Sequence, residues 1–213
     1  MGPHLDYLQK RRDPGQGAQR VTDFCFLPCV MSMFDHILNR SIAHVTRFSG
    51  KPQHFQESVA EHSFFVAYIV SILCSLLKTG GEPVDQEKAL SMALVHDMEE
   101  TFSGDILGPF KHHSPEVTSA IRKVNQEVIQ ETFRDLPETL VRHFVSLWNE
   151  EGEGKTKEAQ IVKTADRLSL LAKCAEEVKV GNDFFKEMYD SQLTFLKEYK
   201  EPWWQKIQHQ VLG

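Results

Sequence analysis

Apolar stretches with helical spacing in this sequence each contain a residue of a type that binds metal ions. His62 lies inside one such stretch, the adjacent His96 and Asp97 end a second, and Asp166 lies inside a third. Burying an ionisable side chain is costly unless it is paired or bound to a metal ion. The chain is therefore constrained to a fold that brings these stretches together, and one shared cation is the simplest common partner.

The apolar periodicity predicts helices throughout the chain and no strands, because no segment shows sustained alternation of apolar and polar residues. Serine, aspartate and proline mark expected helix starts, and glycines mark expected ends. We expect helices over residues 27–47, 58–78, 86–96, 115–133, 137–150, 157–180, 183–198 and 202–211. The predicted fold class is all-α, a compact multi-helix bundle with the metal site at its centre.

Irregular structure is expected directly after His96, where Ser103-Gly104-Asp105 and Gly108-Pro109 interrupt the helical pattern. The same holds for the charged connector 151–157, which contains glycine. Loops held by a helical scaffold are common places for chemistry. Glu100 and Asp105 are therefore predicted to lie in a loop beside the metal ligands.

With 213 residues the chain suits one domain with a full hydrophobic core. Residues 1–20 are polar and contain closely spaced proline and glycine, so we expect a flexible N-terminal arm, followed by a single domain over 21–213. The formal charge of −6 argues against a nucleic-acid polymer as partner. A small anionic substrate is still compatible with local positive charge.

Compartment is indicated by the cysteines and by the apolar runs. The four cysteines form no CxxC pair and suggest neither a disulfide framework nor a thiolate zinc site. The N-terminus lacks the pattern of a signal peptide, and the apolar run 64–77 is shorter than the roughly 20 residues that span a bilayer. We expect reduced thiols, a cytoplasmic location and no membrane partner.

The candidate metal ligands are His62, His96, Asp97 and Asp166. Two imidazoles and two carboxylates suit Mn, Fe, Co, Ni or Zn better than Ca, and Mg is a further candidate; the thiolates of a structural zinc site are missing from this set. Four protein ligands on an ion that accepts six leave positions for water and a substrate oxygen. The predicted cofactor is therefore one divalent ion in a working site.

Charged residues near these ligands suggest what the site acts on. Arg47 and Lys111 would supply the positive charge that an incoming phosphate needs, and arginine can grip phosphate with two parallel hydrogen bonds. Glu100, one turn beyond Asp97, would orient the attacking water as base or acid. Asp105 would accept a hydrogen bond from a sugar hydroxyl or help to position that water.

The ordered series H…HD…D formed by these ligands resembles the signature of the HD-domain metal-dependent phosphohydrolases, an all-helical superfamily. Its flanking residues are similar to those of the 5′-deoxynucleotidase branch over about residues 30–190. The matching motifs are Arg47, Glu57-Ser58-Val59-Ala60-Glu61-His62-Ser63, His96-Asp97-Met98-Glu99-Glu100, Gly104-Asp105, Pro109-Phe110-Lys111 and Lys163-Thr164-Ala165-Asp166.

This resemblance implies a phosphomonoesterase that hydrolyses (deoxy)nucleoside 5′-monophosphates and forms a homodimer. It also implies that Arg47 holds the 5′-phosphate, that Glu100 acts in catalysis on the attacking water, and that Asp105 faces the sugar. The family pattern has tryptophan after the arginine, where it helps to exclude a 2′-hydroxyl, whereas this chain has Phe48. Phe48 keeps the aromatic bulk without the indole N–H, which leaves the preference for deoxyribose open.

Two other functions fit the same residues. The metal cage would also support a phosphodiesterase or pyrophosphohydrolase acting on other nucleotides. A non-catalytic, nucleotide-sensing helical module with a structural or vestigial metal site is the other alternative, which the presence of Glu100, Asp105 and Arg47 disfavours.

Single residues also have plainer interpretations. His62 alone would read as a core histidine, and Asp166 as a surface charge paired with Lys163 or Arg167. Glu100, Arg47 and Lys111 alone would read as solvated charges.

Overall fold

Helices dominate the computed structural model of the chain, which describes residues 32–111 and 113–213. Within these residues the only β-type pairing is an isolated antiparallel bridge between Thr46 and Ser58. The elements are α1 (Met33–Leu38), η1 (Ser41–His44), α2 (Val59–Thr79), α3 (Gln86–Val95), α4 (Glu100–Ser103), α5 (Gly108–Lys111), α6 (Pro115–Phe133), α7 (Glu138–Glu153), α8 (Lys157–Lys179), η2 (Asp183–Phe185), α9 (Lys186–Glu198) and α10 (Pro202–Leu212). The all-α prediction is confirmed.

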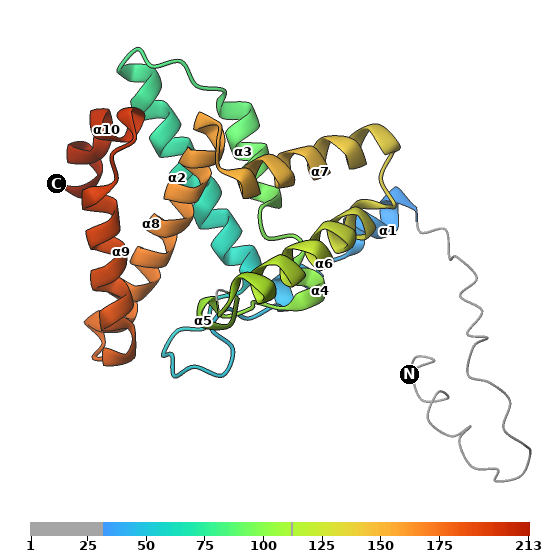
Figure 1. Ribbon diagram of the computed structural model, residues 1–213, viewed down its shortest axis with the longest axis horizontal. Coiled ribbons are helices and arrows are strands. Elements are labelled where there is room, and N and C mark those ends of the chain that lie inside the picture. Colours follow the sequence, from blue (N-terminus) through green and yellow to red (C-terminus); the bar gives the residue numbers. More distant parts are fainter. Residues whose placement is uncertain (1–31, 112) are drawn as a thin grey trace, which may run out of the picture. The chain divides into compact units, whose positions relative to one another are not determined.

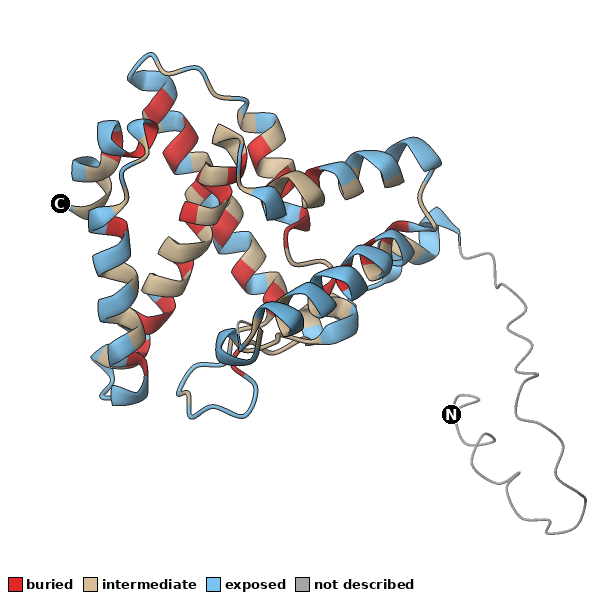
Figure 2. Cartoon of the chain, in the orientation of Figure 1, coloured by how far each residue is buried: buried red, intermediate tan, exposed pale blue. Residues whose placement is uncertain are grey.

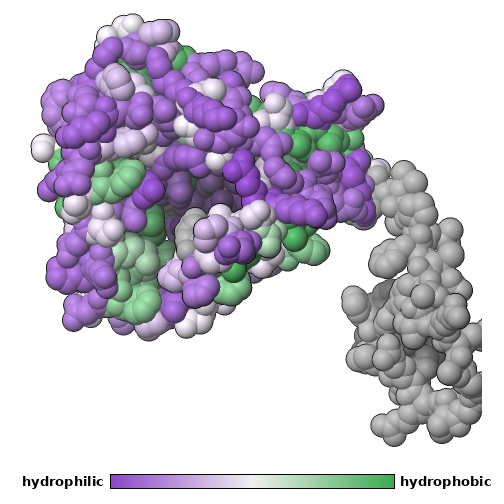
Figure 3. Space-filling model, viewed as in Figure 1, coloured by the Kyte–Doolittle hydropathy of each residue, from purple (hydrophilic) through white to green (hydrophobic). Residues whose placement is uncertain are grey.

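Helices α2 and α8 cross at the centre of the bundle, and α3 packs against both (Figure 1). Helix α9 lies along α8, α10 contacts α2, and α6 and α7 contact each other on the other side of the view. Buried residues gather where α2, α3 and α8 face one another (Figure 2). Hydrophilic residues cover most of the face seen in Figure 3 and surround a hollow in it. The predicted ligands therefore lie on α2 and α8 and directly after α3, the helices that pack together at the centre.

Helix starts follow local capping chemistry. The Ser58 side chain accepts from the Glu61 N–H while the Glu61 carboxylate accepts from the Ser58 N–H, which is a complete capping box at the start of α2. Asp85 caps α3, and Ser114 caps α6 with Pro115 at the first helical position. The predicted starts of these three helices are confirmed.

The expected single helix over 27–47 is wrong within the described residues, which begin at 32. The chain leaves the helical conformation at Asn39, whose side chain accepts hydrogen bonds from the Ser41 N–H and hydroxyl at 2.9 and 2.6 Å. This local bonding competes with the helix backbone, so α1 ends and a 3₁₀ turn follows. The predicted arm over 1–20 and the domain boundary at 20/21 lie outside the described residues.

The expected end of α7 at Glu150 is also wrong. The helix continues through Gly152 and stops at Gly154, which has φ of 65°, a left-handed conformation that glycine adopts without strain. The expected connector 151–157 therefore shortens to a few residues before α8. This correction lengthens α7 but moves no predicted site residue.

Helix α2 spans Val59–Thr79, which confirms the helix expected over 58–78. Taken whole, its 21 residues make it the one helix in the described part of the chain that is long and apolar enough to cross a membrane. Core helices pass the same test, and α2 buries Val66, Val70 and Leu73 against its neighbours while contributing His62 to the interior. Its packing supports the interpretation as a core helix.

The C-terminal tryptophans close the bundle. Trp203 and Trp204 are buried, and their indole N–H groups donate to Gln160 Oε1 at 3.0 Å and to the Leu196 carbonyl at 2.9 Å. The pair therefore packs the terminal helix onto the core. Cys74 and Cys174 are buried free thiols.

Candidate functional site

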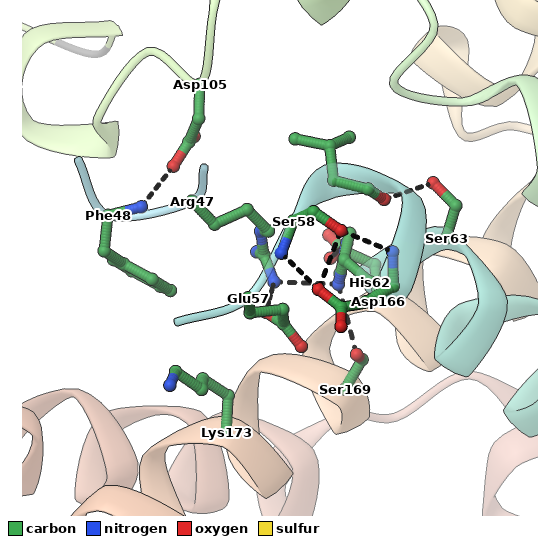
Figure 4. A network of polar contacts seen from close by, with 12 residues as sticks. Arg47, Phe48, Glu57, Ser58, His62, Ser63, Asp105, Asp166, Ser169 and Lys173 are labelled. Atoms are coloured by element: carbon green, nitrogen blue, oxygen red, sulfur yellow. Dashed lines mark hydrogen bonds and ion pairs between the residues drawn. The ribbon is translucent and has the colours of Figure 1, made fainter. Parts of the chain in front are cut away.

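The predicted ligands converge although they come from three parts of the chain. His62 on α2, His96 directly after α3 and Asp166 on α8 place one nitrogen or oxygen atom each within 4.8 Å of one another. Asp97 Oδ2 lies 3.0 Å from His96 Nε2 and 3.6 Å from His62 Nε2, and Asp166 Oδ1 lies 3.1 Å from His62 Nε2. We call His62, His96, Asp97 and Asp166 the His/Asp cluster; Figure 4 shows its α2 and α8 members.

The atoms that face the centre of the His/Asp cluster are left without hydrogen bonds. His62 Nε2 and His96 Nε2 are buried, and neither has a hydrogen-bond partner among residues 32–111 and 113–213. Carboxylate oxygens of Asp97 and Asp166 lie 3.0 to 3.6 Å from these nitrogens, at ion-pair distance but without hydrogen-bond geometry. Two buried, unpaired imidazole nitrogens beside two carboxylates fit a divalent cation.

Local structure explains how His96 and Asp97 share one centre. The chain leaves α3 in tight turns, with the Glu100 N–H donating to the Asp97 carbonyl at 3.0 Å, so the Asp97 carboxylate folds back beside the His96 ring. Burial alone would lower the pKa of His96, but the Asp97 carboxylate reverses that effect and raises the pKa to about 10. A cation that binds there must therefore displace a proton.

Exposure differs across the His/Asp cluster. The side chains of His62 and His96 are 0% and 4% exposed, whereas those of Asp97 and Asp166 are 23% and 44% exposed. The cluster is therefore closed on its imidazole side and open on its carboxylate side. An ion and a substrate would approach over the carboxylates.

Arg47 reaches the His/Asp cluster from the loop before α2. The Thr46–Ser58 bridge fixes this loop, and the Arg47 N–H donates to the Glu57 carbonyl at 2.9 Å. The guanidinium NH1 donates to Glu57 Oε2 at 2.7 Å and lies 2.8 Å from His62 Nδ1 (Figure 4). Glu57 orients Arg47, a role that the sequence did not reveal although Glu57 stands in the matching motif.

Two adjacent glutamates after the His-Asp pair differ in their bonding. Glu99 accepts from the Trp148 indole at 2.7 Å and from the Asn125 amide at 3.5 Å, so it ties α7 and α6 to the turn. Glu100 Oε2 is buried and has no hydrogen-bond partner among the described residues. Burial, Asp97 and Asp105 raise the pKa of Glu100 to about 9. Burial and Asp97 raise the pKa of Glu99 as well, to about 7, but both of its oxygens are hydrogen-bonded, whereas Glu100 has a free oxygen.

Asp105 lies between α4, which begins at Glu100, and α5, which ends at Lys111; the expectation of a loop is therefore wrong for Glu100 and confirmed for Asp105. Asp105 Oδ2 accepts from the Phe48 N–H at 2.7 Å, which holds Phe48 in a left-handed conformation with φ of 54°. Asp105 thus fixes the turn that carries Arg47, in addition to its expected role towards the sugar. Lys111 ends α5, and its charge opposes the rise in the Glu100 pKa.

Phe48 is more buried than a ligand-facing ring would be. The residue is 8% exposed, and its ring packs edge-on against Phe185 at a centroid distance of 5.3 Å. The Arg47 guanidinium carbon lies 5.3 Å from the Phe48 ring centroid. The expected contact of Phe48 with a sugar stays a prediction.

A second buried charged group, the loop anchor, consists of Lys173 and Glu177 on α8. Their side chains form an ion pair of 2.7 Å, and Glu177 also accepts from the N–H groups of His54 and Phe55 at 2.9 and 3.0 Å and from the Asn182 amide at 2.8 Å. Lys173 donates to the Phe55 carbonyl. The loop anchor holds the segment between Arg47 and α2, and sequence reasoning missed it.

Comparison with known proteins agrees with this geometry. The sequence profile described as 5′-deoxynucleotidase YfbR-like matches residues 33–210. A 5′-deoxynucleotidase of Vibrio vulnificus is 32% identical over 130 residues, which cover 61% of this chain and 66% of that protein. The match thus spans just under two thirds of the relative's length.

Solved structures show the same fold. An HD-domain phosphohydrolase of Listeria innocua superposes with a TM-score of 0.74 at 27% identity, covering 85% of this chain and 88% of that one. The cyanophage S-2L HD phosphohydrolase, bound to dA and one catalytic Zn²⁺ ion, has a TM-score of 0.56 at 17% identity and covers 85% of this chain and 92% of that one. At that identity the second likeness shows the fold alone.

Proposed function

Since the chain belongs to the YfbR-like 5′-deoxynucleotidase family, we propose that it is a metal-dependent phosphomonoesterase that hydrolyses (deoxy)nucleoside 5′-monophosphates to nucleoside and phosphate. The observation that carries this proposal is the pair of buried, unpaired Nε2 atoms of His62 and His96 facing Asp97 and Asp166. A purely structural core would pair or replace such groups. The family assignment supports the same reaction.

His62, His96, Asp97 and Asp166 would hold one divalent ion. The mixed nitrogen and oxygen set admits Mn, Co, Fe, Ni, Zn or Mg. When bound, such an ion polarises a phosphoryl oxygen and makes water a stronger nucleophile. The exposed side of Asp97 and Asp166 gives the substrate phosphate its approach.

Arg47 would bind the 5′-phosphate. Its guanidinium lies beside His62, and Glu57 occupies only part of its donor capacity because the group has five N–H donors. Lys111, at the end of α5, adds positive charge near Glu100. Glu57 holds Arg47 in place, which reduces the conformational entropy that Arg47 loses when phosphate binds.

Glu100 would move the proton during hydrolysis. Its buried Oε2 atom has no other hydrogen bond within the described residues, and its raised pKa keeps a proton on the group near neutral pH. A cation in the His/Asp cluster would lower that pKa towards the range useful for acid and base catalysis. Asp105 would position the Arg47–Phe48 turn and face the sugar.

The setting of the enzyme is proposed as well: a small-molecule substrate, a cytoplasmic location and a homodimer. The buried Trp203 and Trp204 make the C-terminal segment part of the core, which weakens it as a dimer contact. Exposed apolar side chains lie instead on α2, at Phe64, Tyr68 and Ile72. Sedimentation of the purified chain would test the dimer.

A phosphate-release assay over deoxy- and ribonucleoside 5′-monophosphates, with Mn²⁺, Co²⁺, Zn²⁺ or Mg²⁺ added singly, tests the proposal. We expect cation-dependent release of phosphate and nucleoside, and loss of both bound cation and turnover in Asp97→Ala. Turnover without any cation would rule the mechanism out. Release of pyrophosphate, or cleavage of cyclic nucleotides in preference to monophosphates, would instead favour the pyrophosphohydrolase or phosphodiesterase alternative.

A further inference from the structure

The two cluster histidines differ in what faces their second ring nitrogen. His96 Nδ1 lies 2.8 Å from the Ala93 carbonyl oxygen, which can only accept a hydrogen bond. His96 Nδ1 must therefore carry a proton, so a cation can bind this ring only at Nε2, after displacing any proton held there. The backbone of α3 alone fixes this ring.

His62 Nδ1 has two side-chain neighbours instead. Ser169 Oγ lies 3.1 Å away, and Arg47 NH1 lies 2.8 Å away. A serine hydroxyl can accept or donate, whereas a guanidinium can only donate and keeps its protons. The contact with Arg47 requires a bare Nδ1, which puts the proton of a neutral ring on Nε2, where a cation would bind.

Ser169 is built into the site rather than lying near it by chance. It is 3% exposed and lies three residues after Asp166, so α8 presents both on one face. Within the described residues, the bond to His62 is the only hydrogen bond of its side chain. The helix that supplies one carboxylate of the His/Asp cluster thus also supplies the partner of the opposite imidazole.

We propose that Ser169 is a positioning residue: its hydroxyl oxygen accepts a hydrogen bond from the Nδ1–H of His62 and so directs His62 Nε2 towards the cation. The contact of Arg47 with His62 Nδ1 and the binding of a cation at His62 Nε2 then exclude each other. When a cation occupies Nε2, Arg47 leaves Nδ1 and is free to bind phosphate, while Glu57 still holds the Arg47 guanidinium. This inference rests on the proposed function. It needs only a change of tautomer, with no net change of protonation.

Cation affinity tests the role of Ser169 without relying on activity. Equilibrium dialysis of the full chain with Co²⁺, together with the Co²⁺ absorption spectrum, should show binding weakened by about 10- to 100-fold in Ser169→Ala, as is usual for loss of a histidine's outer partner. Thr164→Val is the matched control, because Thr164 has a buried hydroxyl on α8 that donates to the Gln160 carbonyl of its own helix. It should bind Co²⁺ like the wild type.

The outcomes separate the two proposals. Co²⁺ binding by the wild type with unchanged affinity in Ser169→Ala would overturn the inference and leave the proposed function standing. No Co²⁺ binding by the wild type would overturn the proposed function itself. If Ser169→Ala fails to fold, Ser169→Cys decides, because it keeps the shape but accepts weakly: weaker binding supports the inference and equal binding contradicts it.

The displacement of Arg47 has its own readout. In a crystal structure with Zn²⁺ on His62 Nε2, Arg47 should lie beyond hydrogen-bond distance of His62 Nδ1, and Ser169 should remain within it. A retained bond from Arg47 to Nδ1 in that structure would overturn the alternation.

Discussion

The His/Asp cluster and the loop anchor both take charged side chains from α8 and both contain buried polar atoms, but they differ in how those atoms are satisfied. Glu177 in the loop anchor accepts hydrogen bonds from Lys173, two backbone N–H groups and Asn182. The His/Asp cluster leaves two imidazole nitrogens unpaired. A buried polar group whose hydrogen bonds are all made within the protein stabilises the fold, whereas a buried polar group without a partner is a candidate ligand-binding site.

The largest expected effect separates the two regions by activity. Asp166→Asn keeps the shape of the side chain but removes a charge from the His/Asp cluster, so turnover should fall by about 10³-fold or more, since a metal contributes several kcal/mol to the barrier. The free energy of unfolding without added cation should change little, because the Asp166 side chain is 44% exposed. Parallel kinetics and urea titrations would measure both. A strongly destabilised variant would contradict the distinction.

The converse change should act on stability. Glu177→Gln leaves the Lys173 ammonium buried without its counter-charge, and we expect the free energy of unfolding to fall by about 3 kcal/mol or more. Glu176→Gln, one residue earlier on the exposed side of α8, is the control and should cost under about 0.5 kcal/mol. Equal effects of the two substitutions would show that the loop anchor does not stabilise the fold.

Acid should reveal the loop anchor as well. Burial would raise the pKa of Glu177, but hydrogen bonds from His54, Lys173 and Phe55 outweigh burial and lower it to about 2, from 4.5 for a free glutamate. The stabilising effect of this carboxylate is therefore present above about pH 4.5 and is lost as pH falls towards 2. The stability difference between the wild type and Glu177→Gln should shrink over that window. A difference that stays constant would contradict the assigned hydrogen bonds.

The smallest expected effect concerns Phe48, which follows Arg47 in the loop before α2. Phe48→Trp introduces the tryptophan of the family pattern. We expect the ratio of kcat/KM for deoxyribonucleoside monophosphates to kcat/KM for ribonucleoside monophosphates to rise by about 3- to 10-fold, as for a modest steric difference. Burial of Phe48 against Phe185 makes Phe48→Leu the control, which should disturb packing without raising selectivity. Unchanged selectivity in Phe48→Trp would remove Phe48 from the sugar site.

Where local chemistry decides the structure, the sequence was sufficient. The Ser114-Pro115 start and the Phe133 end of α6 were predicted correctly, since a cap and a proline act within one turn. The break at Asn39 was missed because periodicity of apolar residues does not register a side chain that accepts a hydrogen bond from the backbone two residues on. Convergence of the four cluster residues was predicted from the cost of burial together with the family resemblance.

What the sequence did not reveal depends on contacts between distant segments. Asp166, Ser169, Lys173 and Glu177 form one polar stripe at helical spacing along α8, which is visible in the sequence once it is sought. Their partners are 104 to 123 residues away, at His62 and in the loop at His54 and Phe55. Only the folded structure shows that the Asp166 end of the stripe faces unpaired imidazole nitrogens, whereas the Glu177 end has its hydrogen bonds made within the protein.

Anomalous diffraction from crystals grown with Zn²⁺ or Co²⁺ tests the central claim most directly. We expect one peak at roughly 2.0–2.2 Å from the Nε2 atoms of His62 and His96, with Asp97 and Asp166 completing the protein ligands. Crystals that contain the cation but show no peak between these four side chains would contradict it.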